Sequence, residues 1–119
     1  MFTPILLALL PLVSARSKSF TVDFSTYDPT NHTVAEFLAN YSLIINNYTV
    51  DSASDPFSRT YTASNVDISD GYLTLTVTGG TQNGSSVPSA AIQTNDTNIR
   101  SGTFKTTAIA SNVSGVCHG

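Results

Sequence analysis

Charged side chains are scarce in this sequence. They make up 11% of its residues, against about 25% in an average soluble domain. Five basic residues and a net charge of -3 leave no basic patch, so we expect neither nucleic acid nor an anionic membrane as a partner. Serine, threonine and asparagine take the place of the charges, and these residues favour strands, turns and surfaces over helix interiors.

Side chains for catalysis or metal binding are also few. The sequence has one cysteine, Cys117, and one glutamate, Glu36. A single cysteine cannot complete a zinc set, and adjacent residues such as Cys117 and His118 point to opposite faces of a strand, which prevents Cys-His nucleophilic chemistry. We therefore predict no catalytic residue, no cofactor and no metal site. In an oxidising compartment, Cys117 either links two chains into a dimer or is one half of a disulfide whose partner lies outside this sequence.

Long apolar runs are missing after the first 15 residues. Residues 5–13 (ILLALLPLV) are apolar, but they are too few for a membrane span, which needs ~20 residues. Small residues follow at 14 and 15, so residues 1–15 are predicted to be a cleaved signal peptide. Residues 16–119 then form one domain, and the product is expected to be secreted, extracellular or in the cell wall.

Sequons for N-linked glycosylation are abundant. Asn-x-Ser/Thr occurs at Asn31, Asn40, Asn47, Asn83, Asn95 and Asn112. Together with a signal peptide, six sequons predict that at least some carry glycans. Each sequon in use must face water, so the six also mark expected surface positions.

Alternation of apolar and polar residues indicates an all-β fold of short strands. Strands are expected at 20–24, 41–45, 48–50, 65–69, 72–77, 90–94 and 103–110. Ile92 is expected to point inward, and Phe104 is the largest side chain of the last strand. Asp70-Gly71 is a preferred two-residue hairpin turn, and Leu73, Leu75 and Val77 are expected to face the core from the strand that follows it. Polar stretches at 51–60 and 79–89 are predicted loops.

One short helix interrupts this pattern. Thr33 and Glu36 have the spacing of a capping box, in which the two residues satisfy each other's backbone amides at a helix start. A helix over residues 34–39 is therefore predicted, and the only glutamate of the chain is expected in its cap.

The aspartates are better explained by structure than by chemistry. Asp67 and Asp70 are close in sequence, as a carboxylate pair would be, but Asp70 precedes Gly71 in a turn signature and Asp67 falls on the polar face of its strand. Solvated positions are expected for Asp23, Asp28, Asp51 and Asp55.

Four tyrosines raise the question of sugar binding. Tyr41, Tyr48, Tyr61 and Tyr72 could stack on sugar rings, but isolated tyrosines in alternating strands more often lie at the edge of a core. An edge-of-core position is therefore the preferred interpretation.

Three motifs follow in a fixed order: NVDISDGYLTLTV at 65–77, SAAIQT at 89–94 and SGTFKTTAIASNVSGVCHG at 101–119. In this order they resemble the first half of fungal members of glycoside hydrolase family 16, over residues 20–119. Members of that family are secreted, have a concanavalin A-like jelly-roll sandwich and act on β-glucan or related cell-wall polysaccharide. The resemblance implies an incomplete jelly-roll sandwich of antiparallel strands.

Departures from the family pattern concern its chemistry. The family cleaves with two glutamates of a Glu-x-Asp-x-x-Glu strand in a retaining scheme, and this sequence has no such motif. It also has Ser101 in place of an aromatic residue, Ile109 where relatives often carry a base, and no tryptophan. We therefore expect the N-terminal portion of such a hydrolase or transglycosylase, inactive alone. The alternatives are a small non-catalytic β-sandwich that binds cell-wall glycan, and a structural secreted glycoprotein without a ligand.

Overall fold

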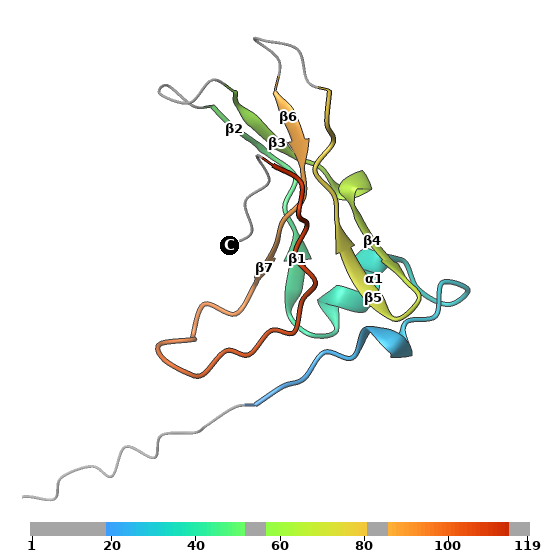
Figure 1. Cartoon of the computed structure of the whole chain (residues 1–119). Helices are drawn as coiled ribbons and strands as arrows, with labels where there is room; N and C mark the ends of the chain where they lie inside the picture. Colours follow the sequence, from blue (N-terminus) through green and yellow to red (C-terminus); the bar gives the residue numbers. More distant parts are fainter. Residues whose placement is uncertain (1–18, 52–56, 81–85, 115–119) are drawn as a thin grey trace, which may run out of the picture.

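The structure is a computed structural model that describes residues 19–51, 57–80 and 86–114 (Figure 1). Seven short strands and one short α-helix make up most of the regular structure of these residues, which confirms the all-β expectation. The elements are η1 (Phe24–Thr26), α1 (Val34–Ala39), β1 (Leu43–Ile45), β2 (Thr49–Val50), β3 (Arg59–Tyr61), η2 (Ala63–Asn65), β4 (Val66–Ser69), β5 (Tyr72–Leu75), β6 (Val87–Ser89) and β7 (Ile92–Thr94).

Some of the sequence-based expectations concern other residues. The signal peptide at 1–15 and the expectations for Asp55, Asn83, Cys117 and His118 lie outside the described residues. Within the described ranges, no helix has the length and apolarity that a membrane crossing would need.

Two stretches of chain, one with β1 and β2 and the other with β6 and β7, take part in two consecutive sheets, β1-β7 and β2-β3-β6. At one end β1 pairs with β7 in antiparallel fashion, with Ile44 opposite Gln93. At the other end β3 lies between them, antiparallel to β2 and parallel to β6. The expectation of antiparallel strands throughout is therefore wrong at the β3·β6 pair. The physical reason is that the β4–β5 hairpin reverses the chain once and the connection to β6 reverses it again, so β6 runs in the direction of β3.

The helix forms as predicted, with the same bounds. Thr33 is its N-cap and Glu36 its third residue, and both halves of the capping box are present. α1 ends at Ala39 with Asn40 as its C-cap, and Ser42 then takes a positive φ of 57° that turns the chain into β1. This left-handed residue shortens the predicted strand at 41–45 to Leu43–Ile45.

The hairpin of β4 and β5 also forms as predicted. Asp70 and Gly71 have φ values of 51° and 79°, the two left-handed positions that a type I′ turn requires. Only Leu73 of the three expected core residues packs against the core, since Leu75 and Val77 remain 48% and 42% exposed. α1 packs mainly on β1 and β4.

The core lies where α1 meets the hairpin and β1. Phe37, Leu38, Val66 and Ile68 are buried, and half-buried residues including Ile92 pack around them, as expected for Ile92. The ring of Phe37 lies within 6.4 Å of those of Phe24, Tyr27 and Tyr41, measured between centroids. This aromatic cluster fixes the N-terminal segment to the helix.

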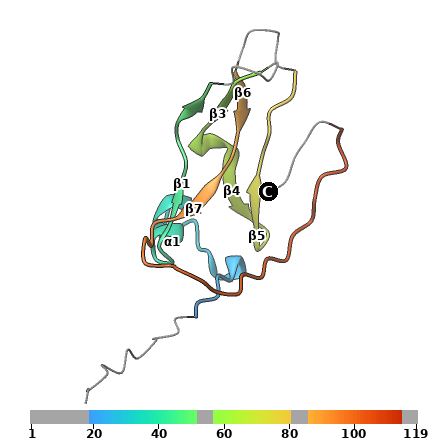
Figure 2. The same ribbon diagram turned by 90° about the vertical axis from the view of Figure 1, so that its left-hand side faces the viewer.

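Four predictions of strand or loop are wrong. Residues 20–24 form no strand, because the Asp23 carboxylate accepts the Ser25 amide at 3.0 Å and turns the chain into η1. β3 and β6 begin inside the predicted loops at 51–60 and 79–89, since their pairing comes from distant segments. Residues 103–110 form no strand either. They run as a fully exposed extended chain with no strand beside them, apart from the sheets (Figure 2).

Candidate functional site

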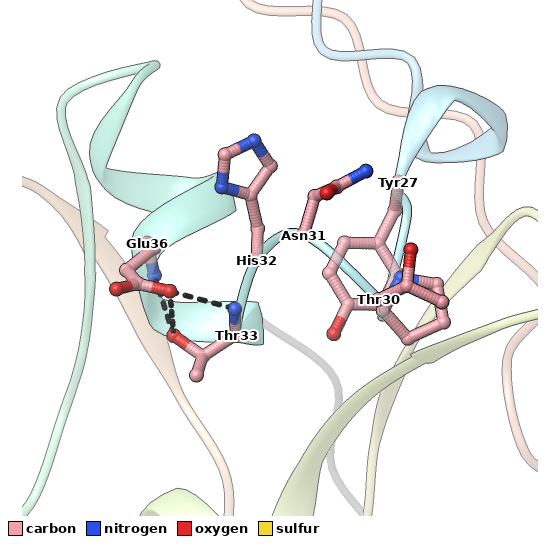
Figure 3. A pocket seen from close by; sticks show the side chains of 7 residues that line it. Tyr27, Thr30, Asn31, His32, Thr33 and Glu36 are labelled. Atoms are coloured by element: carbon pink, nitrogen blue, oxygen red, sulfur yellow. Dashed lines mark hydrogen bonds between the residues drawn. The ribbon is translucent and has the colours of Figure 1, made fainter.

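A shallow cavity of about 370 Å³ opens beside the start of α1 (Figure 3). Its walls come from the segment before the helix and from the first turn, and most of its lining side chains are polar. The lining residues are Tyr27, Pro29, Thr30, Asn31, His32, Thr33 and Glu36.

The Glu36 carboxylate in this cavity is committed to the helix cap. Its Oε2 accepts the backbone amide and the hydroxyl of Thr33, both at 2.8 Å, while the Thr33 hydroxyl accepts the Glu36 amide at 3.3 Å. These bonds from the Thr33 amide, and then from its hydroxyl, lower the pKa of Glu36. A carboxylate held in its ionised form has no proton to give to a leaving group at neutral pH.

Asp28, the carboxylate that precedes Glu36 in the sequence, is also held by hydrogen bonds from neighbouring residues. Its Oδ1 accepts the hydroxyl of Thr30 at 2.7 Å and the Thr30 amide at 2.9 Å, and its Oδ2 accepts the Asn31 amide group at 2.6 Å. The bond from the Thr30 hydroxyl is the largest cause that lowers the pKa of Asp28. Acid–base cleavage of a glycosidic bond needs one protonated and one ionised carboxyl group, and Asp28 and Glu36 are both held ionised.

Four further aspartates occupy structural or solvated positions. Asp67 is exposed on the polar side of β4, and Asp70 forms the hairpin turn, as predicted. Asp23 caps η1, and Asp51 is exposed beside the end of β2. Across 19–51, 57–80 and 86–114, no three His, Cys, Asp or Glu side chains gather in a way that could hold a metal ion.

The four tyrosines separate into three environments. Tyr41 packs against Phe37 in the core, as the edge-of-core interpretation predicts. Tyr72 lies on β5 with 65% of its surface exposed. Tyr48 and Tyr61 contact each other edge to face, with ring centroids 5.3 Å apart, and Tyr48 is 50% exposed.

This tyrosine pair lies on one face of the β2–β3 ladder. The Tyr61 amide donates to the Tyr48 carbonyl at 2.9 Å, which puts the two residues opposite each other. Successive side chains alternate between faces, so Arg59 shares the face of Tyr61. The neighbouring hydroxyls of Thr49 and Thr60, 3.0 Å apart, lie on the other face. We call the surface of Tyr48, Arg59 and Tyr61 the tyrosine face.

Polar groups accompany the rings on this face. Asn46 is buried and its side-chain amide donates to the Tyr48 hydroxyl at 3.5 Å, whereas Arg59 is exposed. Aromatic rings pack against the apolar C–H faces of sugars, while amide and guanidinium groups donate to sugar hydroxyls. Arg59 was not predicted in this role from the sequence. The alternation in Arg59-Thr60-Tyr61 was available as a signal, but it lay in a stretch that was predicted to be a loop.

The sequons of the described residues are all at the surface. Asn31, Asn40, Asn47, Asn95 and Asn112 are exposed, which meets the physical requirement for a glycan, and glycan attachment itself stays a prediction. Alternation puts Asn47 on the side of β2 that faces away from Tyr48. A glycan on Asn47 would therefore leave the tyrosine face open.

Comparisons with known proteins give no similar protein: no family model matches this chain, and neither a curated protein nor a solved structure does. The family 16 resemblance thus stands on the three sequence motifs, and the candidate site stands on the geometry of its own residues.

Proposed function

We propose that this chain is the N-terminal portion of a secreted jelly-roll β-sandwich similar to glycoside hydrolase family 16, and that it binds cell-wall polysaccharide of the β-glucan class through the tyrosine face. The observation that carries this proposal is the edge-to-face contact of Tyr48 and Tyr61 at 5.3 Å, with half of Tyr48 open to solvent.

The pair is suited to a flat, weakly polar ligand. Tyr61 is half-buried and limits how the Tyr48 ring can turn, so little side-chain freedom is lost when a sugar stacks on Tyr48. β-Glucans present C–H faces for stacking and hydroxyls that the exposed Arg59 can bind, and they carry no charge that would need a larger basic surface.

Cleavage is not part of the proposed activity of this chain. Its only glutamate, Glu36, is fixed as an ionised helix cap. Support for an incomplete sandwich comes from apolar side chains that no element of the described residues covers, such as Phe104 at 71%, Ile109 at 91% and Val113 at 63% exposure, because a complete sandwich buries such residues between its sheets.

Retention on insoluble β-glucan tests the proposal. We expect the chain to be retained and to release no reducing sugar. Tyr48→Ala should weaken binding about two- to twelvefold, as the loss of an aromatic contact of about 0.5–1.5 kcal/mol predicts. Tyr72→Ala is the matched control, since it removes a more exposed tyrosine that lies outside the tyrosine face. Equal losses in the two variants, or no retention of the parent chain, would refute the proposal.

A further inference from the structure

β5 and the residues that continue it form an outer edge of the molecule. On one side, the Thr76 amide donates to the Asn65 carbonyl and the Thr78 amide to the Pro88 carbonyl, both at 2.9 Å. Amides alternate between the two sides of a strand, so those of Leu73, Leu75 and Val77 point the other way. No strand of the described residues pairs with that side. We call these three residues the β5 edge.

Nothing in the sequence protects this edge from another strand. Proteins guard such edges with charged side chains, proline or covering elements. Residues 72–80 (YLTLTVTGG) contain no charged residue, no proline and no sequon. The ladder of β1 and β7, by contrast, is flanked by sequons at Asn40, Asn47 and Asn95.

The chain also carries an extended segment of the complementary kind. Residues 103–110 (TFKTTAIA) are all exposed and form no strand, and Lys105 is their only charged residue. In Figure 2 the segment stands apart from the sheets, so it does not pair with its own β5. The backbone N–H and C=O groups of an extended segment can form hydrogen bonds with the edge of a sheet. Phe104 and Ile109 also give this segment apolar surface to bury.

We propose that the β5 edge accepts residues 103–110 of a second copy of this chain as an added strand. One chain supplies both members of the contact, an uncharged acceptor edge and a nearly uncharged donor, so a second copy is the partner that both surfaces fit. Two copies that exchange segments close into a dimer, whereas one-way exchange continues into a longer assembly. This contact uses β5 and is independent of glycan binding by β2 and β3.

The test uses the full chain with Cys117→Ser, so that disulfide-linked dimers do not contribute. Sedimentation equilibrium across a range of concentrations should show reversible association. Hydrogen exchange should show that residues 73–77 and 103–110 become protected together as the concentration rises.

Two charge substitutions probe the two sides of the contact. Val77→Lys and Phe104→Lys should each raise the dissociation constant about tenfold or more, since a charge blocks strand addition. Gln93→Lys adds the same charge at an exposed position of β7 and should change it by about twofold or less. Phe104 is 71% exposed, so its variant decides the question if Val77→Lys does not fold.

Three results would overturn the inference. The chain could remain monomeric at every concentration, or both lysine variants could associate like the parent. Alternatively, residues 103–110 could be protected in the monomer, which would mean that they pair within their own chain.

Discussion

The rings of Tyr48 and Tyr61 meet edge to face across the β2–β3 ladder, with centroids 5.3 Å apart and planes at 66°. Their residues face each other in register, and the Tyr61 amide bonds to the Tyr48 carbonyl. The pair therefore has two consequences: it ties β2 to β3, and it holds one tyrosine ring at the surface in a defined orientation.

A double-mutant cycle should detect the contact as a coupling energy. Replacing Tyr48 and Tyr61 by leucine, singly and together, is expected to give a coupling of about 0.5–1.5 kcal/mol in the free energy of unfolding, measured by urea denaturation. A second cycle between Tyr61 and Tyr72 is the control, and it should be additive to within about 0.5 kcal/mol because the two residues do not share a strand pair. Additivity in the first cycle would contradict the observed ring contact.

A side chain at Gly71 should destabilise the hairpin turn. With φ at +79°, an added Cβ is strained, and it would also lie 3.4 Å from the Ser25 Cβ. Gly71→Ala is expected to cost about 1–2 kcal/mol of unfolding free energy, measured by denaturant titration. Gly79→Ala is the matched control, because a Cβ added there would have no atom within 4 Å and the φ of Gly79 lies outside the left-handed range. Similar losses at both glycines would show that the turn is not as described.

Leu38 should contribute most to the core. Its side chain is fully buried, at 0% exposure, whereas Leu75 is 48% exposed on β5. Leu38→Ala is expected to lower the free energy of unfolding by about 2–5 kcal/mol, and Leu75→Ala by about 1 kcal/mol or less. Thermal or chemical unfolding of the two variants decides between this core and one in which the predicted face of Leu73, Leu75 and Val77 is buried. In the second case, Leu38→Ala and Leu75→Ala would lower the free energy of unfolding by similar amounts.

Acid should destabilise the N-terminal part of the fold. Hydrogen bonds from Ser25, Thr30 and Thr33 lower the pKa values of Asp23, Asp28 and Glu36, respectively. A lowered pKa means that the folded state favours the ionised form, so this stability is fully present above the ordinary values of 3.8 for Asp and 4.5 for Glu. It is lost as the pH falls through the lowered values.

Thermal melts from about pH 6 to about pH 3 check this. We expect a flat melting temperature above about pH 5 and a decline below it. The decline should be smaller in Glu36→Gln, whose neutral amide keeps part of the cap but does not titrate. A melting temperature that rises on acidification would contradict the assigned hydrogen bonds.

Local signals in the sequence predict the parts of the fold that depend on neighbours in the chain. Thr33 and Glu36 are three residues apart, and their capping box starts the helix at the predicted residue. Asp70-Gly71 likewise gives the hairpin, because the turn needs two left-handed residues and nothing from elsewhere.

Local sequence signals do not predict the structure of a segment that depends on a partner far away in the chain. Val87-Pro88-Ser89 has the composition of a loop and becomes β6 only by pairing with β3. Residues 103–110 have the alternation of a strand and form none, because no edge lies beside them. At 20–24, the pattern of period two competes with a stronger local effect, the bond of Asp23 to Ser25. For the candidate site, the sequence predicted only that four tyrosines could contact sugars. The pairing of Tyr48 with Tyr61, and the position of Arg59 on the same face, follow from the strand register.

Tyrosine fluorescence during titration with a soluble β-glucan oligosaccharide tests the central claim most directly. The chain has no tryptophan, so its intrinsic emission reports on the tyrosines alone. The tyrosine face predicts a saturable change in emission that is abolished in the Tyr48→Ala, Tyr61→Ala double variant and retained in Tyr72→Ala. A parent chain whose emission does not respond, or a response that survives in the double variant, would contradict the assignment of glycan binding to Tyr48 and Tyr61.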